Sequence, residues 1–253
     1  SESRGGNNGN SAVFISSGGA LVTSRGGVRS KLSWVDRDGR VVPVIPESRA
    51  FYNPSLSPDE GRIAVLVTEG QKSDVLIYDE TTTTFSRLTT AETVTSVSWT
   101  AEGTHIVFAA SGERARSAVW RQRASGGSPA EKLFEHAELT SGAVLSPDSR
   151  SLVVQTYHQN SWDVSRLVLD SSGTVSTYLA SPGQELGPQF SPDGKWIAVT
   201  TDESGRYEVY VRSFPDPSSR VQVSVAGGAE PTWSSDGTRL YYRSGDAILA
   251  ARV

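Results

Sequence analysis

The segment Gln189–Val199, QFSPDGKWIAV, places a Ser-Pro-Asp-Gly tetrapeptide between two short apolar runs. Pro at the second position of a type I β-turn presets φ to about −65°, and Ser and Gly are preferred at its first and fourth positions. Alternating residues precede the turn and a β-rich run follows it. The segment therefore predicts two antiparallel strands joined as a hairpin.

Four near-copies of this segment occur in the chain. They are SLSPDEGRIAV at 55–65, SWTAEGTHIVF at 98–108, VLSPDSRSLVV at 144–154 and TWSSDGTRLYY at 232–242. Aligned on the acidic residue of the turn, from Asp59 to Asp236, the copies recur every 43 to 46 residues. A degenerate copy, AVFISSGGALV at 12–22, places Ser17 at 42 residues before Asp59. Such a period indicates a repeat protein in which each repeat is one supersecondary unit.

A second hairpin completes each repeat. In the fifth copy, Val209–Phe214 and Val221–Val225 predict the third and fourth strands. Four short antiparallel strands in a period of about 44 residues describe one blade of a β-propeller. We therefore predict an all-β, six-bladed propeller of four-stranded antiparallel blades over 11–253, preceded by a flexible tail or linker over 1–10. The repeats are expected at about 11–50, 51–93, 94–138, 139–184, 185–227 and 228–253.

The last blade is predicted to be incomplete, because the sequence ends with AILAARV, Ala247–Val253, after the third strand of that repeat. Its fourth strand would come from the N-terminal segment or from sequence missing here. Residues 1–10 are rich in Gly, Asn and Ser, which are weak strand formers. A seven-bladed parent that lacks one blade is the alternative to six blades.

Apolar residues recur two positions apart on each first strand, which places both members of a pair on one face of the strand. A single blade cannot bury both of its faces, so stacking on neighbouring blades is expected to supply the stability. The second member of each pair predicts one layer of contacts between blades: Phe14, Leu56, Trp99, Leu145, Phe190 and Trp233.

The composition excludes several classes of function. The chain has 253 residues and a formal net charge of −4, whereas nucleic-acid binders usually carry a basic patch. There is no Cys, so the fold uses neither a disulfide nor a thiolate metal site. The longest apolar runs have about five residues, far short of a membrane span. We expect no nucleic-acid partner and no membrane insertion by this chain itself.

Catalytic and metal-binding patterns are weak in this sequence. The three histidines, His105, His136 and His158, are not at metal-ligand spacing, and there is no Gly-x-Ser-x-Gly elbow for a nucleophile. The recurrent turn acids are interpreted as residues that accept hydrogen bonds from nearby backbone N–H groups, and so are Asp36 and Asp38. We therefore predict a chain that is not an enzyme and uses no cofactor or metal.

Three longer segments resemble a known family. They are SPDGKWIAVTTDESGRYEVYVRSFPDP at 191–217, GGAEPTWSSDGTRLYY at 227–242 and LSWVDRDGRVVPV at 32–44. With the SPDG turns, they resemble the WD40-like propeller repeat of the TolB type (PD40), in particular the C-terminal propeller of bacterial eukaryotic-type serine/threonine kinases. The resemblance implies an extracytoplasmic sensor domain, periplasmic or at the cell surface, tethered to a membrane through sequence upstream of residue 1. It covers about residues 12–253 and specifies no ligand, and no kinase motif is present in the chain.

Loops on a rigid scaffold usually carry the binding site. The connections that enter each first strand and the loops between second and third strands should share one face, and this face is predicted to bind a protein, a peptide or a small ligand at the channel mouth. Two alternatives remain open: a TolB-like periplasmic interaction scaffold, and the gating propeller of an oligopeptidase severed from its hydrolase. The candidate binding residues are Asn53, Arg114, Arg116, Tyr157, His158, Trp162, Glu185, Glu203, Arg206, Tyr207 and Glu230.

Overall fold

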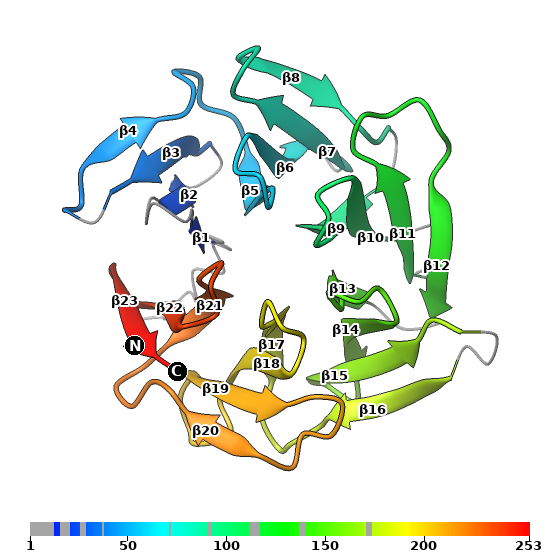
Figure 1. Ribbon diagram of the computed structural model, residues 1–253, viewed down its shortest axis with the longest axis vertical. Coiled ribbons are helices and arrows are strands. Elements are labelled where there is room, and N and C mark those ends of the chain that lie inside the picture. Colours follow the sequence, from blue (N-terminus) through cyan, green and yellow to red (C-terminus); the bar gives the residue numbers. More distant parts are fainter. Residues whose placement is uncertain are drawn as a thin grey trace, which may run out of the picture.

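Small antiparallel sheets stand side by side around a central axis in the computed structural model (Figure 1). The structure describes residues 13–15, 21–25, 29–36, 38–70, 72–90, 93–111, 117–136, 140–170 and 174–253. All regular secondary structure within these residues is β-strand. The predicted all-β class is therefore confirmed.

The first half of the chain forms three blades, each numbered from its innermost strand outward. Blade 1 contains β1 (Val13–Ile15), β2 (Leu21–Arg25), β3 (Lys31–Val35) and β4 (Val41–Pro43). Blade 2 contains β5 (Phe51–Leu56), β6 (Arg62–Glu69), β7 (Lys72–Asp79) and β8 (Thr84–Arg87). Blade 3 contains β9 (Thr93–Trp99), β10 (His105–Ser111), β11 (Ser117–Arg123) and β12 (Glu131–His136). One parallel pair, Ser73 with Thr93, joins blades 2 and 3 at a single point.

The second half forms three more blades. Blade 4 contains β13 (Thr140–Leu145), β14 (Ser151–His158), β15 (Ser161–Val168) and β16 (Val175–Leu179). Blade 5 contains β17 (Glu185–Phe190), β18 (Trp196–Thr201), β19 (Glu208–Ser213) and β20 (Arg220–Gln222). Blade 6 has three strands among the described residues, β21 (Ala229–Trp233), β22 (Arg239–Ser244) and β23 (Ala247–Arg252). The predicted tail, residues 1–10, lies outside the described part of the chain.

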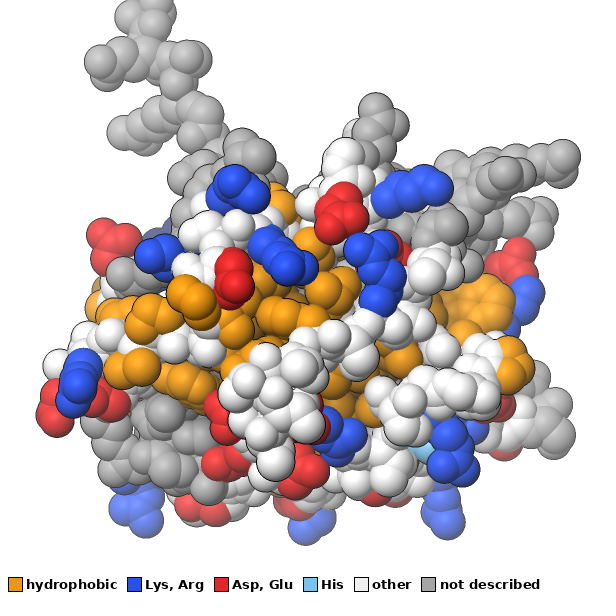
Figure 2. All heavy atoms as spheres, turned by 90° about the horizontal axis from the view of Figure 1, so that it is seen from above, with side chains coloured by type: hydrophobic (Ala, Val, Ile, Leu, Met, Phe, Trp, Pro, Cys, Tyr) orange, Lys and Arg blue, Asp and Glu red, His pale blue; other side chains and the backbone are white. Residues whose placement is uncertain are grey.

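The innermost strands close a ring. Each of β1, β5, β9, β13, β17 and β21 contacts the next, and β21 contacts β1. The six sheets thus form a propeller with first strands at the centre and fourth strands at the rim (Figure 1). Figure 2 views the ring from its rim, where hydrophobic side chains gather between charged ones. Val41 and Val42 of β4 are exposed on this rim.

The turn of the repeat forms as predicted. In blade 5, Gly194 N donates to Ser191 O at 2.9 Å, which closes the turn, and Asp193 Oδ1 accepts from Lys195 N at 3.1 Å. Ser191 Oγ lies 2.6 Å from Asp193 Oδ1 and accepts from Trp196 N at 3.0 Å. Equivalent Ser–Asp contacts occur in blades 2, 4 and 6. The interpretation of these acids as turn residues is confirmed.

The predicted layer between blades is also present. Trp99 is buried in a cluster with residues of blades 2 and 3, and its Nε1 donates to Ser55 O of blade 2 at 2.9 Å. Trp233 donates from Nε1 to Gln189 O of blade 5 at 3.2 Å. Leu56, Leu145 and Phe190 lie in clusters at three other junctions, whereas the side chain of Phe14 is outside the described residues. Stacking of blade on blade therefore forms the core.

The fourth strand of blade 5 is shorter than the sequence suggests. The run Val221–Val225 predicts a strand to residue 225, but β20 ends at Gln222. The backbone N–H groups of Val223 and Ser224 both donate to Val209 O, at 2.8 Å and 3.4 Å. The ladder is therefore broken there, and the side chain of Val225 is left exposed.

Candidate functional site

The two ends of the ring carry different kinds of segment. One end of the ring, which we call the loop face, carries the connections between second and third strands, at 159–160, 202–207 and 245–246. It also carries the connection 180–184, which leads into β17. We call turn face the opposite end, with the turns 57–61, 100–104, 146–150, 191–195 and 234–238. The strand registers bring the start of each first strand to the end of its second strand, as in the pair Glu185 with Thr201. The predicted sharing of one face by these two sets of loops is therefore confirmed.

Two predicted residues sit at bulges of the innermost strands. The register shifts between Tyr52 and Ser55 and between Ala229 and Thr232, and the residues in the bulges, Asn53 and Glu230, have φ of 45° and 58°. A bulge turns a side chain out of the regular alternation, and few residues with a Cβ adopt such φ values. Blades 4 and 5 have Gly142 and Gly187 at the equivalent positions.

The two bulge residues have different partners. Asn53 Nδ2 donates to Thr95 O of blade 3 at 3.3 Å. Glu230 forms a two-point ion pair with Arg243, whose Nε lies 3.0 Å from Oε2 and whose NH2 lies 2.5 Å from Oε1. Burial raises the pKa of Glu230, and the Arg243 guanidinium opposes that rise. Both side chains are half-buried at inner strands and are already hydrogen-bonded within the chain.

A cavity of about 220 Å³ opens among the inner strands near the turn face. Trp99 and Trp233 also line it. One residue from each of blades 2 to 6, at the position four before the turn acid, contributes to its wall: Ser55, Ser98, Val144, Gln189 and Thr232. Four of these five residues are polar, and they can hydrogen-bond a small polar group or a peptide segment within a lining that also has apolar side chains.

Exposed aromatic residues gather on the loop face of blades 4 and 5. Tyr157 and Trp162 are directly opposite each other in the β14–β15 hairpin, with ring centroids 5.2 Å apart. Tyr157 is 37% exposed, and Tyr207 in the next blade is 43% exposed. Aromatic side chains are enriched in interface hot spots, so a face that carries them is better suited to bind a partner than a uniformly charged face is.

Gln184 fixes the two hairpins that carry these aromatic residues. Its Oε1 accepts from Trp162 N at 3.0 Å, and its own N donates to Asp202 Oδ1 at 2.7 Å. Ser161 Oγ donates to Gly183 O at 2.9 Å in the same connection. We call the three side chains Tyr157, Trp162 and Tyr207 the aromatic patch, and the connection 180–184 lies between the segments that present it.

The charged residues predicted for this face are mostly engaged within the chain. Arg206 Nε lies 2.5 Å from Glu208 Oε1, and its NH2 donates to Val225 O. Glu203 pairs with Arg220, 3.1 Å from Oε2 to NH1. His158 is exposed next to Tyr157, whereas Arg114 and Arg116 lie outside the described residues. Arg206 and Glu203 thus shape the edge of the face and hold its loops.

Glu185 does not lie at an exposed channel mouth, where we expected it, because its side chain is fully buried. Ser181 Oγ donates to its Oε1, Thr201 Oγ1 lies 3.5 Å from the same atom, and Oε2 has no partner within the described part of the chain. Burial raises the pKa of Glu185 to about 7, and the nearby Asp163 carboxylate adds to the rise. Glu185 follows Gln184 directly in the chain, so this carboxyl group is buried at the base of the connection 180–184.

Sequence reasoning missed Ser181, Gln184 and Asp202, which organise this region. Gln184 acts through a contact with blade 4, Asp202 through a contact with Gln184, and Ser181 through the Glu185 carboxyl group, and no motif in the sequence signals these contacts. Among the residues that the structure describes, no group of three or more His, Asp or Glu side chains could hold a metal ion. The arrangement supports recognition through aromatic and hydrogen-bonding groups.

No family model matches the chain. A curated relative is an uncharacterized protein, Atu1656, from Agrobacterium fabrum, 26% identical over 136 residues. That match covers 53% of this chain and 45% of the relative, so the chain spans less than half the length of the curated relative that it matches.

Solved structures give broader matches. A putative TolB from Agrobacterium tumefaciens has a TM-score of 0.73 at 18% identity and matches 89% of this chain and 84% of its own. The shared fold is the six-bladed β-propeller. Enzymes share this fold too. A gluconolactonase from Xanthomonas campestris has a TM-score of 0.75 at 15% identity, and the match covers 96% of this chain and 85% of the gluconolactonase chain. A puromycin hydrolase has a TM-score of 0.63 at 18% identity, and the match covers 93% of this chain and 42% of the hydrolase chain. No helix among the described residues is long and apolar enough to cross a membrane.

Proposed function

We propose that this chain is a non-catalytic binding module that presents its loop face to a protein or peptide partner. The observation that carries the proposal is the aromatic patch, in which Tyr157 and Tyr207 are exposed on hairpins of adjacent blades that Gln184 holds together. A site whose side chains are fixed before binding loses less conformational entropy when the partner docks. Binding is therefore assigned to blades 4 and 5, with His158, Arg206 and Glu203 at its edge.

The inner strands supply a second part of the proposed site. Asn53 and Glu230 hold bulged positions beside the ring centre, where a small ligand or the end of a peptide would meet them. Glu185 contributes from below the surface, by supporting the connection 180–184. Arg114 and Arg116 follow β10 in the sequence, lie outside the described residues and stay predicted contributors to binding.

The cellular role that we propose is that of an extracytoplasmic sensor domain of a bacterial serine/threonine kinase, tethered through sequence upstream of residue 1. The three segments that resemble such propellers support it. The structural similarity to TolB-type propellers supports an interaction scaffold in general, including a separate periplasmic one. The sequence upstream of Ser1 in the gene distinguishes them, because a kinase and a membrane span there support the sensor, and a signal peptide followed by an α/β domain supports the scaffold.

A hydrolase-linked propeller is the competing proposal, and the match to 42% of a puromycin hydrolase favours it. In that case the chemistry would belong to another domain, and the propeller would control access to it. The purified chain should then remain inactive alone, as in our proposal, but a hydrolase domain should be encoded next to it. Hydrolysis of a nitrophenyl ester, a lactone or a peptide by the purified chain contradicts the non-catalytic assignment.

The binding proposal is tested by capture from a bacterial cell-envelope extract followed by quantitative mass spectrometry. The double variant Trp162→Ala/Tyr207→Ala should lose captured partners at least about tenfold, because hot-spot aromatics each contribute more than 1 kcal/mol. Val42→Ala, an exposed apolar residue on the rim of blade 1, is the matched control and should capture as the unchanged chain does. Equal capture by all three proteins shows that the aromatic patch is not the binding surface.

A further inference from the structure

A second cavity, of about 390 Å³, lies between blades 4 and 5 on the turn face, opposite the aromatic patch. The turns of both blades form two of its walls, through Asp148 and Gly194. Phe214 and Pro215, which follow β19, form another, and Arg166 projects from β15. The volume is within the range of about 300–1,000 Å³ that small-molecule sites usually have.

Arg166 has no carboxylate partner among the described residues, whereas its counterpart in blade 3 has one. Arg121 occupies the same register position, opposite Val107, and binds Glu131 on β12 through Nε at 3.1 Å and NH2 at 2.7 Å. In blade 4 the residue opposite Arg166 on β16 is Ser176. The Nε atom of Arg166 is buried and has no hydrogen-bond partner among the described residues.

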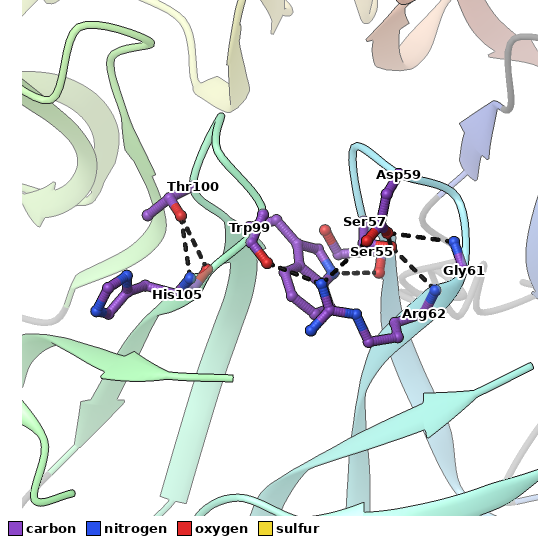
Figure 3. A network of polar contacts seen from close by, with 9 residues as sticks. Ser55, Ser57, Asp59, Gly61, Arg62, Trp99, Thr100 and His105 are labelled. Carbon is purple, nitrogen blue, oxygen red and sulfur yellow. Dashed lines mark hydrogen bonds and ion pairs between the residues drawn. The ribbon is translucent and has the colours of Figure 1, made fainter. Parts of the chain in front are cut away.

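The cavity itself corresponds to a space that an arginine fills between blades 2 and 3. There, Arg62 lies over the Trp99 ring at 4.7 Å, donates from Nη2 to Gly103 O at 2.9 Å and pairs with Asp59 at 3.2 Å (Figure 3). The equivalent residue of blade 4 is Ser151, whose short side chain lines the cavity beside Gly194. The short side chain of Ser151 thus leaves open the space that Arg62 fills at the other junction.

Two arginines, Arg150 and Arg166, and two acids, Asp148 and Asp193, line the cavity. Its two acids are engaged in their turns: Asp148 Oδ1 lies 2.6 Å from Ser146 Oγ and 3.1 Å from Arg150 N, and Asp193 makes the same contacts with Ser191 and Lys195. The serine hydrogen bonds, in the first place, hold the pKa of both carboxyl groups below their ordinary value. The guanidinium of Arg166 is stacked against the Phe214 ring, 5.1 Å from its centroid, and has hydrogen-bonding capacity left over.

We propose that this cavity binds a small ligand that carries a single carboxylate, with Arg166 as its ion-pair partner and Phe214 as an apolar wall. The ligand carboxylate takes the place that Glu131 takes beside Arg121. One negative charge suits the site better than two, because Asp148 and Asp193 remain ionised nearby and repel a dianion. The carboxylate belongs to a free acid or to the C-terminus of a peptide, and the proposal does not rest on the binding function of the loop face.

The test follows the Nε–H resonance of Arg166 in the ¹H–¹⁵N spectrum of the full chain, titrated with benzoate and with a tripeptide whose C-terminus is free or amidated. We expect saturable shifts with benzoate, with the free tripeptide, or with both, at a Kd of about 1 mM or tighter. Binding of benzoate points to a free acid, and binding of the free tripeptide alone points to a peptide end. Equal binding of the amidated tripeptide, a preference for inorganic phosphate, or no shift with any probe overturns the proposal.

Two variants separate binding from folding. Arg166→Gln should weaken binding by at least about tenfold, whereas Arg121→Gln, which removes a guanidinium that is already paired, should leave it unchanged. Ser176→Glu supplies the acid that blade 4 lacks and should compete with the ligand, with thermal stability unchanged or raised. If Ser176→Glu folds and binds as tightly as the unchanged chain, Arg166 is not the ligand partner and the proposal fails.

Discussion

The junction between blades 2 and 3 and the junction between blades 4 and 5 contain the same kind of turn, but the first is filled by side chains and the second contains a cavity. In the first, Arg62 crosses from one blade to the backbone of the next and covers Trp99. In the second, Ser151 stands in place of the arginine, Phe190 stands in place of the tryptophan, and a cavity of about 390 Å³ remains. The repeated turn thus fixes where blades meet, and single residues beside it decide whether the junction is filled or can accept a ligand.

Removing the aromatic residue of each junction should have the largest effect. Trp99→Ala is expected to lower the free energy of unfolding by about 5 kcal/mol and Phe190→Ala by about 3 kcal/mol, the two ends of the range for buried aromatic residues. The Trp99→Ala variant also lacks the hydrogen bond to Ser55 O and the contact with Arg62. Urea unfolding followed by circular dichroism measures both, with Val42→Ala as an exposed control. A larger loss in Phe190→Ala contradicts the view that the first junction is the tighter one.

Glu185 should make stability at the second junction depend on pH. Its folded-state pKa is raised to about 7 from 4.5, so the folded chain keeps this proton where the unfolded chain has lost it. Stability should therefore fall as pH rises from about 4.5 to about 7, by up to about 3 kcal/mol for a shift of this size. Glu185→Gln should remove that loss, so that the variant is more stable at pH 8 and similar at pH 4.

Glu208 is the matched control for this prediction, because it is also buried in blade 5 but is ion-paired. Although burial acts against its charged form, the hydrogen bonds from Ser224 and Arg206 hold its pKa below the ordinary value. Glu208→Gln should therefore lose stability above the pKa of the unfolded chain, the opposite of Glu185→Gln. Parallel pH profiles for the two variants contradict the assignment of Glu185 as the unpaired group.

Exchanging the residue three positions after the turn acid should convert one junction toward the other. Arg62→Ser should cost about 1–2 kcal/mol, because it removes a cation–π contact and a hydrogen bond to the next blade. Ser151→Arg should recover less than that, since Arg150 and Arg166 already line the space. Thermal unfolding measures both changes, and Ser151→Arg should also abolish carboxylate binding. A gain from Ser151→Arg equal to the loss from Arg62→Ser shows that those two arginines do not oppose it.

The sequence reveals the ring because its signal is local. The turn residues, recurring every 43 to 46 residues, predict the turns, and the apolar residue three before each turn acid predicts the layer that contains Trp99 and Phe190. The end of β20 at Gln222 was not predictable, because Val223 looks like a strand residue and its N–H turns to Val209 O only in the folded sheet. Local pattern thus determines the fold and leaves strand ends to tertiary contacts.

The site was harder to predict for the same reason. Exposed aromatic residues in loops were visible, and Trp162 and Tyr207 do lie on the loop face. The depth of Glu185 was not visible, because the residue at this position, the first of β17, differs between blades, with Phe51 buried at the equivalent position of blade 2. That Ser176 stands in blade 4 where Glu131 stands in blade 3 can be recognised only when the strand register is known. Contacts between blades therefore carry the part of the site that sequence reasoning misses.

The serines of the turns should give the smallest effects and test whether all junctions share one turn. Ser191→Ala should cost about 1–2 kcal/mol, because Trp196 N loses a buried acceptor. The same loss is expected for Ser57→Ala and Ser146→Ala, which are also buried. Ser234→Ala should cost only about 0.5 kcal/mol, since Ser234 is half-buried and water can replace its hydroxyl group.

The pKa of the turn acid provides a second, independent measure of the effect of Ser191→Ala. The Ser191 hydroxyl group is the main cause that lowers the pKa of Asp193, so Ser191→Ala should raise that pKa toward 3.8. A lowered carboxyl pKa stabilises the fold above the unfolded-state pKa, and this stabilisation is lost as pH falls through the folded-state value. The unchanged chain should therefore resist acid to a lower pH than Ser191→Ala does. Side-chain carboxyl NMR measures the shift, and an unaltered Asp193 titration shows that the hydroxyl group does not hold the turn.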